Sequence, residues 1–237
     1  MINVDYSYSS VKLDDLKKYE KEIKNIVLNF KNKNCKGNEF LGLYELPNQI
    51  SDKEFSKIEQ VANNIKKDSD VFVVCGIGGS YLGSRAVIES IKGYYNTDIE
   101  IVYLGNTFDE RYISDTIEYL KNKDFSINVI SKSGTTLETA VAFRLLKALL
   151  VEKYGDESYK RIYVTTDEKN GCLREAAKKE NYESFIIPKD VGGRFSIFTP
   201  VGLLPLAVAG VDIRKFVNGA KMFYEDFQKD SLEENIA

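Results

Sequence analysis

The stretch that decides the fold is Val71-Phe72-Val73-Val74-Cys75-Gly76-Ile77-Gly78-Gly79-Ser80. Five apolar residues that run into glycines are typical of a strand buried on both faces of a parallel sheet. Similar apolar runs recur at residues 99–104, 125–130, 161–164 and 184–187, with helix-like segments near residues 83–92, 109–122, 136–153 and 172–180. This alternation predicts an α/β fold in which a five-stranded parallel sheet is sandwiched by helices.

Helices are also expected on both sides of this region. Apolar residues at helical spacing predict an amphipathic helix over residues 11–30, and Ser51 with Glu54 has the spacing of a capping box that opens a second helix. The uncharged segment 195–211 contains two prolines and is short for a membrane span, which favours a buried loop and helix. We therefore divide the chain into an N-terminal helical segment (1–66), an αβα domain (67–211) and a final helix and linker (212–237).

The composition excludes several kinds of active site. The chain has 237 residues, a formal net charge of -3 and no histidine, so it holds no Ser-His-Asp triad, no Cys-His dyad and no histidine-ligated metal. Its three widely spaced cysteines predict reduced, core-packed thiols in a cytoplasmic protein. The mildly acidic balance and the absence of an apolar leader argue against nucleic-acid and membrane partners, and we predict neither a metal nor a cofactor.

Glycines and serines follow the first predicted strand. Residues 76–85 include four glycines and two serines. The segment does not match a dinucleotide-binding turn, because Tyr81 stands where a glycine or alanine is needed, and it lacks the Gly-Lys-Ser/Thr of a P-loop. A tight strand-to-helix turn accounts for some of these glycines, but their number favours close backbone contact with a ligand.

The segment after the third strand predicts a phosphate site. Residues 131–139 read Ser-Lys-Ser-Gly-Thr-Thr-Leu-Glu-Thr and place five hydroxyl groups at the start of a helix. Hydroxyls and backbone N–H groups at such a point bind an anion without metal, whereas N-capping by Thr135 or Thr136 needs only one hydroxyl. Lys132 is ambiguous, since its ammonium could neutralise the ligand or point to solvent.

The segment after the fifth strand contains Gly192-Gly193-Arg194. Alone, this triplet is equally typical of a surface turn with a solvated arginine. Its place at the carboxyl end of a strand favours a function, because ligands of open α/β sheets bind beyond those ends. The three segments together predict a site for a small phosphorylated metabolite, although no general base is evident and Glu138 fits a structural role better.

These three motifs, in this order, resemble the phosphoglucose isomerase family of the bacterial type. Residues 76–83 resemble its first phosphosugar loop, residues 131–139 its phosphate loop and residues 191–202 its signature segment. The resemblance covers most of the chain, including Phe40-Leu41-Gly42. It implies a sugar-isomerase domain and the interconversion of glucose 6-phosphate and fructose 6-phosphate through an enediolate, as part of glycolysis and gluconeogenesis.

The resemblance also assigns roles to residues. It implies that Arg194 faces the reacting carbons, where a cation stabilises the enediolate. It further implies that a set of loop residues binds the phosphorylated hexose: Gly79, Ser80, Ser131, Lys132, Ser133, Thr135, Thr136 and Thr139.

One departure from the family concerns activity. Family members are twice this length, and the glutamate, histidine and lysine that move protons in them have no counterpart here. Residues 232–235 resemble the link into that second half. We therefore expect an N-terminal fragment that is inactive alone, and a homodimer for the full-length protein.

Two other classes of protein share part of this pattern. A non-catalytic phosphosugar-binding module would sense its ligand, but it has no need of a cation at the reacting carbons. The isomerase domain of a hexosamine-forming amidotransferase shares the serine-rich loop but lacks the pattern of residues 76–83.

Overall fold

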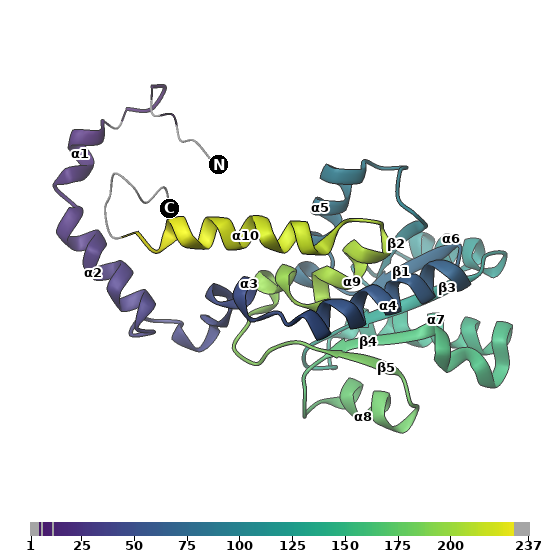
Figure 1. Cartoon of the computed structure of the whole chain (residues 1–237). Coiled ribbons are helices and arrows are strands. Elements are labelled where there is room, and N and C mark those ends of the chain that lie inside the picture. Colours follow the sequence, from purple (N-terminus) through teal and green to yellow (C-terminus); the bar gives the residue numbers. More distant parts are fainter. Residues whose placement is uncertain (1–4, 6, 11, 230–237) are drawn as a thin grey trace.

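Five parallel strands form the centre of the structure, a computed structural model that describes residues 5, 7–10 and 12–229 (Figure 1). The strands are β1 (Val71–Cys75), β2 (Glu100–Leu104), β3 (Phe125–Ile130), β4 (Ile162–Thr166) and β5 (Glu183–Ile186), in the sheet order β2-β1-β3-β4-β5. All four neighbouring pairs are parallel, and Val71 lies in register with Glu100 on one side and with Phe125 on the other. The predicted five-stranded parallel sheet is confirmed.

Helices cover both faces of the sheet. One face carries α4 (Asp52–Asp68), α5 (Leu82–Lys92), α9 (Pro200–Val208) and α10 (Ile213–Phe227), and the other carries α6 (Glu110–Lys121), α7 (Leu137–Tyr154) and α8 (Cys172–Lys179). Successive residues of β1 point to opposite faces, so Phe72 and Val74 join the first apolar cluster whereas Val71 and Val73 join the second. Burial on both sides explains why the strands are continuous apolar runs.

The local signals at α4 and α9 agree with the sequence analysis. Ser51 is the N-cap of α4, and its hydroxyl accepts a hydrogen bond from the Glu54 backbone N–H at 3.2 Å. The segment from residue 195 folds as the 3-10 helix η5 (Gly193–Phe198) followed by α9, all of whose residues are buried. Within the described residues, no helix is both long and apolar enough to cross a membrane.

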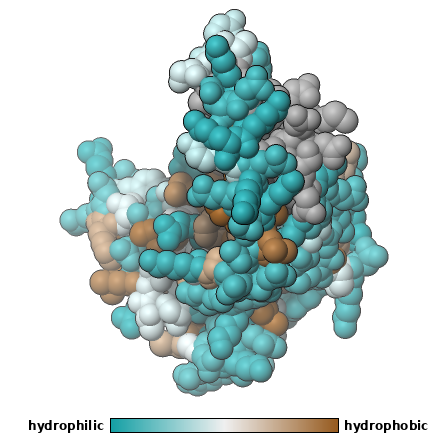
Figure 2. All heavy atoms as spheres, turned by 90° about the vertical axis from the view of Figure 1, so that its left-hand side faces the viewer, coloured by the Kyte–Doolittle hydropathy of each residue, from teal (hydrophilic) through white to brown (hydrophobic). Residues whose placement is uncertain are grey.

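The N-terminal region differs from the single helix predicted over residues 11–30. It forms two helices, α1 (Leu13–Lys17) and α2 (Glu20–Lys31), which curve away from the sheet in Figure 1. Lys18 and Tyr19 lie in the turn between them, and α2 buries none of its residues. Figure 2 views the molecule from this side, where the surface is mostly hydrophilic with separate apolar patches. Because α2 buries none of its residues, tertiary packing contributes little to holding residues 13–31 as one continuous helix.

Aromatic contacts tie the end of α2 to α10. The Phe30 and Tyr44 rings lie 5.1 Å apart, and the Tyr44 and Tyr224 rings are also 5.1 Å apart. The Tyr224 hydroxyl donates to the Glu45 carboxylate at 2.8 Å. The remaining short elements are η1 (Asn38–Phe40), η2 (Gly42–Tyr44), α3 (Leu46–Gln49), η3 (Gly78–Ser80) and η4 (Gly155–Arg161).

The boundaries that we predicted at residues 66 and 211 stay a prediction. Helices on both sides of them share the core of the sheet, since Ile58 of α4 and Val217 of α10 are fully buried in it. The predicted link at residues 232–235 lies outside the described residues. The prediction of core-packed thiols is right for Cys75, which is buried, and wrong for Cys172, which is exposed at the first residue of α8; Cys35 is half-buried.

Candidate functional site

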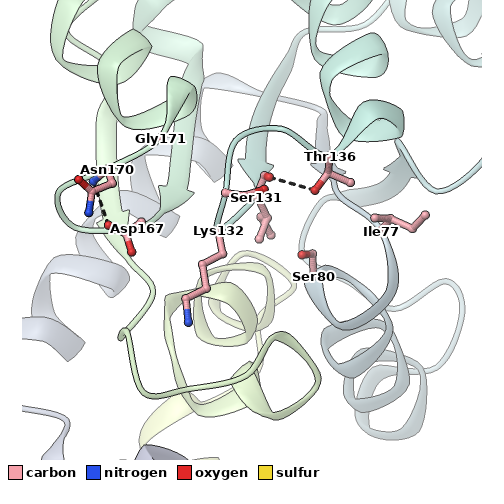
Figure 3. Close-up of a pocket in the computed structure, with 10 residues that line it drawn as sticks. Ile77, Ser80, Ser131, Lys132, Thr136, Asp167, Asn170 and Gly171 are labelled. Carbon is pink, nitrogen blue, oxygen red and sulfur yellow. Dashed lines mark hydrogen bonds between the residues drawn. The ribbon is translucent and has the colours of Figure 1, made fainter. Parts of the chain in front are cut away.

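The sheet order places a ligand site between β1 and β3. The chain leaves β1 toward β2 on one side, and it returns to β3 on the other side of β1. The loops that follow β1 and β3 therefore diverge at this point and leave a crevice at the carboxyl edge of the sheet. A cavity of about 470 Å³ opens there (Figure 3). It is lined by Ile77, Ser80, Ile130, Ser131, Lys132, Ser133, Thr136, Asp167, Asn170 and Gly171.

The phosphate loop (residues 131–136) is folded by its own hydroxyl groups. The Ser131 Oγ accepts a hydrogen bond from the Gly134 N–H at 3.0 Å and lies 3.3 Å from the Thr136 Oγ1. The Ser133 Oγ accepts from both the N–H and the Oγ1 of Thr135, at 3.2 and 2.9 Å. Gly134 adopts a φ of +73°, a left-handed conformation that favours glycine. Local hydrogen bonds thus preform the loop, and we call the hydroxyl groups of Ser131, Ser133, Thr135 and Thr136 the hydroxyl ring.

The start of α7 adds backbone donors to this ring. Thr136 is the N-cap of α7 and has an extended backbone, but its side chain makes no capping hydrogen bond. The first N–H groups of an α-helix lack intrahelical partners, and the helix dipole favours an anion there. Because the N-cap hydroxyl is turned toward Ser131 instead, the helix start is available to a phosphate at the cavity wall.

Thr139 lies one turn further along α7 and is not part of the cavity wall. Its residue is 2% exposed, and its Oγ1 is buried with no hydrogen-bond partner among the described residues. A buried hydroxyl without a partner is uncommon, because leaving it unsatisfied costs free energy. Thr139 lies beside the buried strand residue Cys75, whose Sγ donates to the Thr139 carbonyl oxygen at 3.7 Å.

The Lys132 side chain is neither free in solvent nor directed at the hydroxyl ring. Its Nζ donates to the carbonyl oxygens of Lys189 and Val191, at 2.8 and 3.0 Å. Both acceptors lie in the arginine loop (residues 188–196), which follows β5 and contains Arg194. Neither alternative that the sequence left open for Lys132 describes this contact.

Gly79 and Arg194 meet at the backbone. A Cβ at position 79 would lie 2.2 Å from the Gly193 carbonyl oxygen and 2.9 Å from the Arg194 N. Glycine is therefore required at position 79 by the packing of the arginine loop, and the residue does not line the cavity. Arg194 itself is exposed, and across the described parts of the chain its guanidinium has neither an ion pair nor a hydrogen bond.

The loop after β4 supplies cavity residues that the sequence analysis missed. The Asp167 carboxylate accepts hydrogen bonds from the N–H groups of Lys169 and Asn170, both at 2.9 Å. The hydrogen bonds from the backbone N–H groups of Asn170 and Lys169 hold the pKa of Asp167 below its usual range. The positive charge of Lys132 lowers this pKa further. Since β4 is the neighbour of β3, polar residues after its carboxyl end were a signal for the same site.

Gly171 closes this side of the cavity. Its φ is +99°, and a Cβ on it would lie 2.6 Å from the Ser133 carbonyl oxygen, so the loop after β4 packs directly on the phosphate loop. Of the predicted site residues, Ser80, Ser131, Lys132, Ser133 and Thr136 come together at one cavity wall. Among the described residues, no group of three or more His, Cys, Asp or Glu side chains is arranged to hold a metal ion.

Known proteins match this chain over most of its length. The family model described as phosphoglucose isomerase matches residues 53–237. A glucose-6-phosphate isomerase of Fusobacterium nucleatum is 46% identical over 239 residues, which cover 97% of this chain and 53% of that protein. One of Staphylococcus epidermidis is 51% identical over 205 residues, covering 85% of this chain and 46% of that protein. The chain thus spans about half the length of the curated relatives it matches.

Solved structures share the fold. A hypothetical protein from Thermus thermophilus matches with a TM-score of 0.89 at 30% identity, over 100% of this chain and 55% of that one. A glucose-6-phosphate isomerase from Chlamydia trachomatis matches with a TM-score of 0.76 at 20% identity, over 95% and 48% of the two chains, which shows a common fold. Because the family model matches residues 53–237 and the Fusobacterium nucleatum relative matches 97% of this chain, the chain belongs to the phosphoglucose isomerase family.

Proposed function

We propose that this chain forms the phosphosugar-binding half of an enzyme that interconverts glucose 6-phosphate and fructose 6-phosphate. One observation carries the proposal: the preformed hydroxyl ring at the start of α7 lies at the same sheet edge as Arg194, an exposed arginine whose guanidinium has no partner among the described residues. A hydroxyl ring and a helix start suit the phosphate group of the sugar. An unpaired guanidinium suits a negative charge that develops during the reaction.

In this proposal, the phosphate is bound by the hydroxyl groups of Ser131, Ser133, Thr135 and Thr136 and by the first N–H groups of α7. Ser80, from the loop after β1, lines the same cavity and contacts the sugar. Thr139 is buried and does not line the cavity, so we assign it a supporting role under the start of α7.

The proposed chemistry is a proton transfer between neighbouring carbons. A base removes the proton from C2 of the open-chain aldose, and the electrons form an enediolate. The proton of the C2 hydroxyl passes to the C1 oxygen, and the first proton returns at C1 to give the ketose. Arg194 stabilises the negative charge of the enediolate oxygens, since arginine presents planar, permanently charged donors. The resemblance assigns the base, a histidine and a lysine to the half of the family fold beyond these residues, and this chain contains no histidine.

A chimera tests this function directly. It joins residues 1–237 to the second half of the Fusobacterium nucleatum relative, and its turnover is followed by coupling fructose 6-phosphate conversion to a glucose-6-phosphate dehydrogenase. We expect turnover by the chimera, loss of turnover with Arg194→Ala, and none by the 237-residue chain alone. A folded chimera that binds sugar phosphate without converting it would instead favour a non-catalytic phosphosugar-binding module.

Two further predictions extend beyond this chain. The cytoplasm as its compartment and a homodimer of the full-length protein stay predictions from the sequence. Light scattering of the chimera during size-exclusion chromatography measures its mass, and a monomeric mass at working concentration would contradict the dimer.

A further inference from the structure

Lys132 crosses from the phosphate loop to the arginine loop. Figure 3 shows its side chain extending away from Ser131 and Thr136. The two hydrogen bonds from its Nζ, at 2.8 Å to Lys189 O and 3.0 Å to Val191 O, use two of the three protons of the ammonium group. Two of the three N–H donors of Lys132 therefore bind the backbone segment that precedes Arg194.

The arginine loop is also held from two other directions. Leu41 pairs with Val191 as an antiparallel bridge, and the Gly42 N–H donates to the Asp190 carbonyl oxygen at 3.0 Å. On the far side, Gly79 lies against the Gly193 carbonyl. These contacts come from the N-terminal segment and from the loop after β1, whereas Lys132 adds hydrogen bonds from the phosphate loop.

The base of the Lys132 side chain is fixed to the sheet. The Thr166 Oγ1, at the end of β4, donates to the Ser131 carbonyl oxygen at 2.6 Å, directly before Lys132. A shift of the phosphate loop relative to β4 is thus resisted at one end of Lys132, and a shift of the arginine loop is resisted at the other.

The charges at the cavity argue against simple neutralisation of a phosphate by Lys132. The Asp167 carboxylate lines the same cavity and interacts with the charge of Lys132. These two opposite charges offset each other, which leaves the hydroxyl groups and the start of α7 as the main attraction for an anion.

We infer that Lys132 is a positioning residue that couples occupation of the phosphate loop to the placement of Arg194. The inference rests on the proposed function, because it takes a phosphorylated sugar as the ligand of that loop. A bound dianion holds residues 131–136 more firmly in their preformed arrangement, and the two hydrogen bonds pass this restraint to residues 189 and 191. Such coupling is reciprocal, so an ordered arginine loop strengthens phosphate binding by the same factor.

The experiment combines ligand titration with hydrogen exchange on the 237-residue chain. Glucose 6-phosphate is the probe, its dissociation constant is measured by calorimetry, and exchange is followed by mass spectrometry on a peptide covering residues 189–196. The variants are Lys132→Met, which keeps the length but removes the donors, and Lys132→Arg, which keeps them. Lys169→Met removes an exposed lysine from the loop after β4 and is the matched control for charge.

In the wild-type chain we expect saturating ligand to slow exchange of residues 189–196 by about fivefold or more, a change typical of coupled sites. Lys132→Met keeps the dissociation constant within about fivefold of the wild-type value but loses the slowing, whereas Lys132→Arg and Lys169→Met retain it. A loss of affinity well beyond that range in Lys132→Met, with slowing preserved at saturation, would show that Lys132 neutralises the ligand and would overturn the inference.

The failure of the proposed function has a different signature. If the wild-type chain binds no sugar phosphate, the proposed site is wrong. The restraint of the arginine loop by the two Lys132 hydrogen bonds, which we call the tether, is still tested without ligand. Lys132→Met then speeds exchange of residues 189–196 relative to Lys169→Met if Lys132 holds the arginine loop, and equal rates would contradict the tether as well.

Discussion

Gly79 and Gly193 touch so closely that a single added methyl group on Gly79 would lie 2.2 Å from the Gly193 carbonyl oxygen. The two residues belong to the loops after β1 and β5, which are separated in the sheet by β3 and β4. This contact brings the arginine loop, which follows the outermost strand β5, to the loop after β1 at the carboxyl ends of the strands. It is this packing, rather than a bound ligand, that requires glycine at position 79.

Gly79→Ala is therefore expected to destabilise the fold and displace the arginine loop. The overlap involves backbone atoms that cannot rotate away, and overpacking of this kind costs about 1–3 kcal/mol. Urea denaturation measures the loss of free energy of unfolding. Gly193→Ala is the matched control, because a Cβ there meets nothing within 4 Å, and equal losses in the two variants would contradict this explanation.

Removing hydroxyl groups from the phosphate loop should weaken anion binding. Ser133→Ala with Thr136→Ala is expected to lose about 1.5–3 kcal/mol of binding free energy for each hydrogen bond to the charged phosphate. Chemical-shift titration with inorganic phosphate or glucose 6-phosphate measures this loss. Ser114→Ala removes a hydroxyl that bonds only locally within α6, at 3.0 Å to the Arg111 carbonyl oxygen, and should leave affinity unchanged.

Arg194→Lys in the chimera should lower kcat more than it raises KM. An arginine directed at developing charge acts mainly in the transition state, and lysine lacks its planar pair of donors. Steady-state kinetics separate the two effects. Arg111→Lys, at an exposed position on α6, is the control, and an unchanged kcat with a raised KM in Arg194→Lys would mean that Arg194 only holds the substrate.

Acid should loosen the loop after β4 through Asp167. The N–H groups of Asn170 and Lys169 lower the pKa of Asp167, so its folded-state pKa lies below its unfolded one. Such a group stabilises the fold above the unfolded pKa, near 4, and this contribution is lost as the pH falls through the folded pKa. The effect is small, because the side chain is half-exposed. Asp167→Asn should therefore show a shallower fall in unfolding free energy than wild type between about pH 5 and pH 2, and parallel curves would contradict this role.

The thiols should react in the order of their exposure. Cys172 is exposed, so a thiol reagent is expected to modify it in the folded chain. Burial raises the pKa of the Cys75 thiol to about 12, so Cys75 should react only after unfolding. Cys172→Ser should remove the fast phase of labelling, and a fast phase that persists in this variant would assign it to the half-buried Cys35 instead.

The sheet was predictable because burial on both faces leaves a strong pattern. The run from Val71 to Cys75 and the run from Phe125 to Ile130 become strands with the predicted bounds, since parallel strands between helix layers are apolar throughout. The N-terminal pattern misled because helical spacing shows which face is apolar but not whether a partner covers it. In α2 the apolar side chains of Ile26 and Leu28 remain exposed.

The cavity was only partly predictable. The loops after β1 and β3 were predicted because each contains an unusual number of glycines or hydroxyl-bearing residues. The loop after β4 was missed because its Asp167 and Asn170 are ordinary turn residues, and only the strand order places them beside the phosphate loop. The partners of Lys132 were beyond sequence reasoning, since its acceptors are backbone carbonyls 57 and 59 residues away.

The separation between Lys132 and its acceptors bears on how the chain is made. A ribosome adds residues from the N-terminus, so residues 131–136 emerge well before residues 189 and 191 exist to receive the ammonium. Contacts between distant parts of a chain form late, because the intervening segment must first be closed. The hydroxyl ring is then a product of early local folding, whereas its connection to Arg194 is completed only when β5 docks on the sheet. A nascent chain stalled before residue 189 would carry the phosphate loop but neither Arg194 nor the carbonyl groups that Lys132 binds.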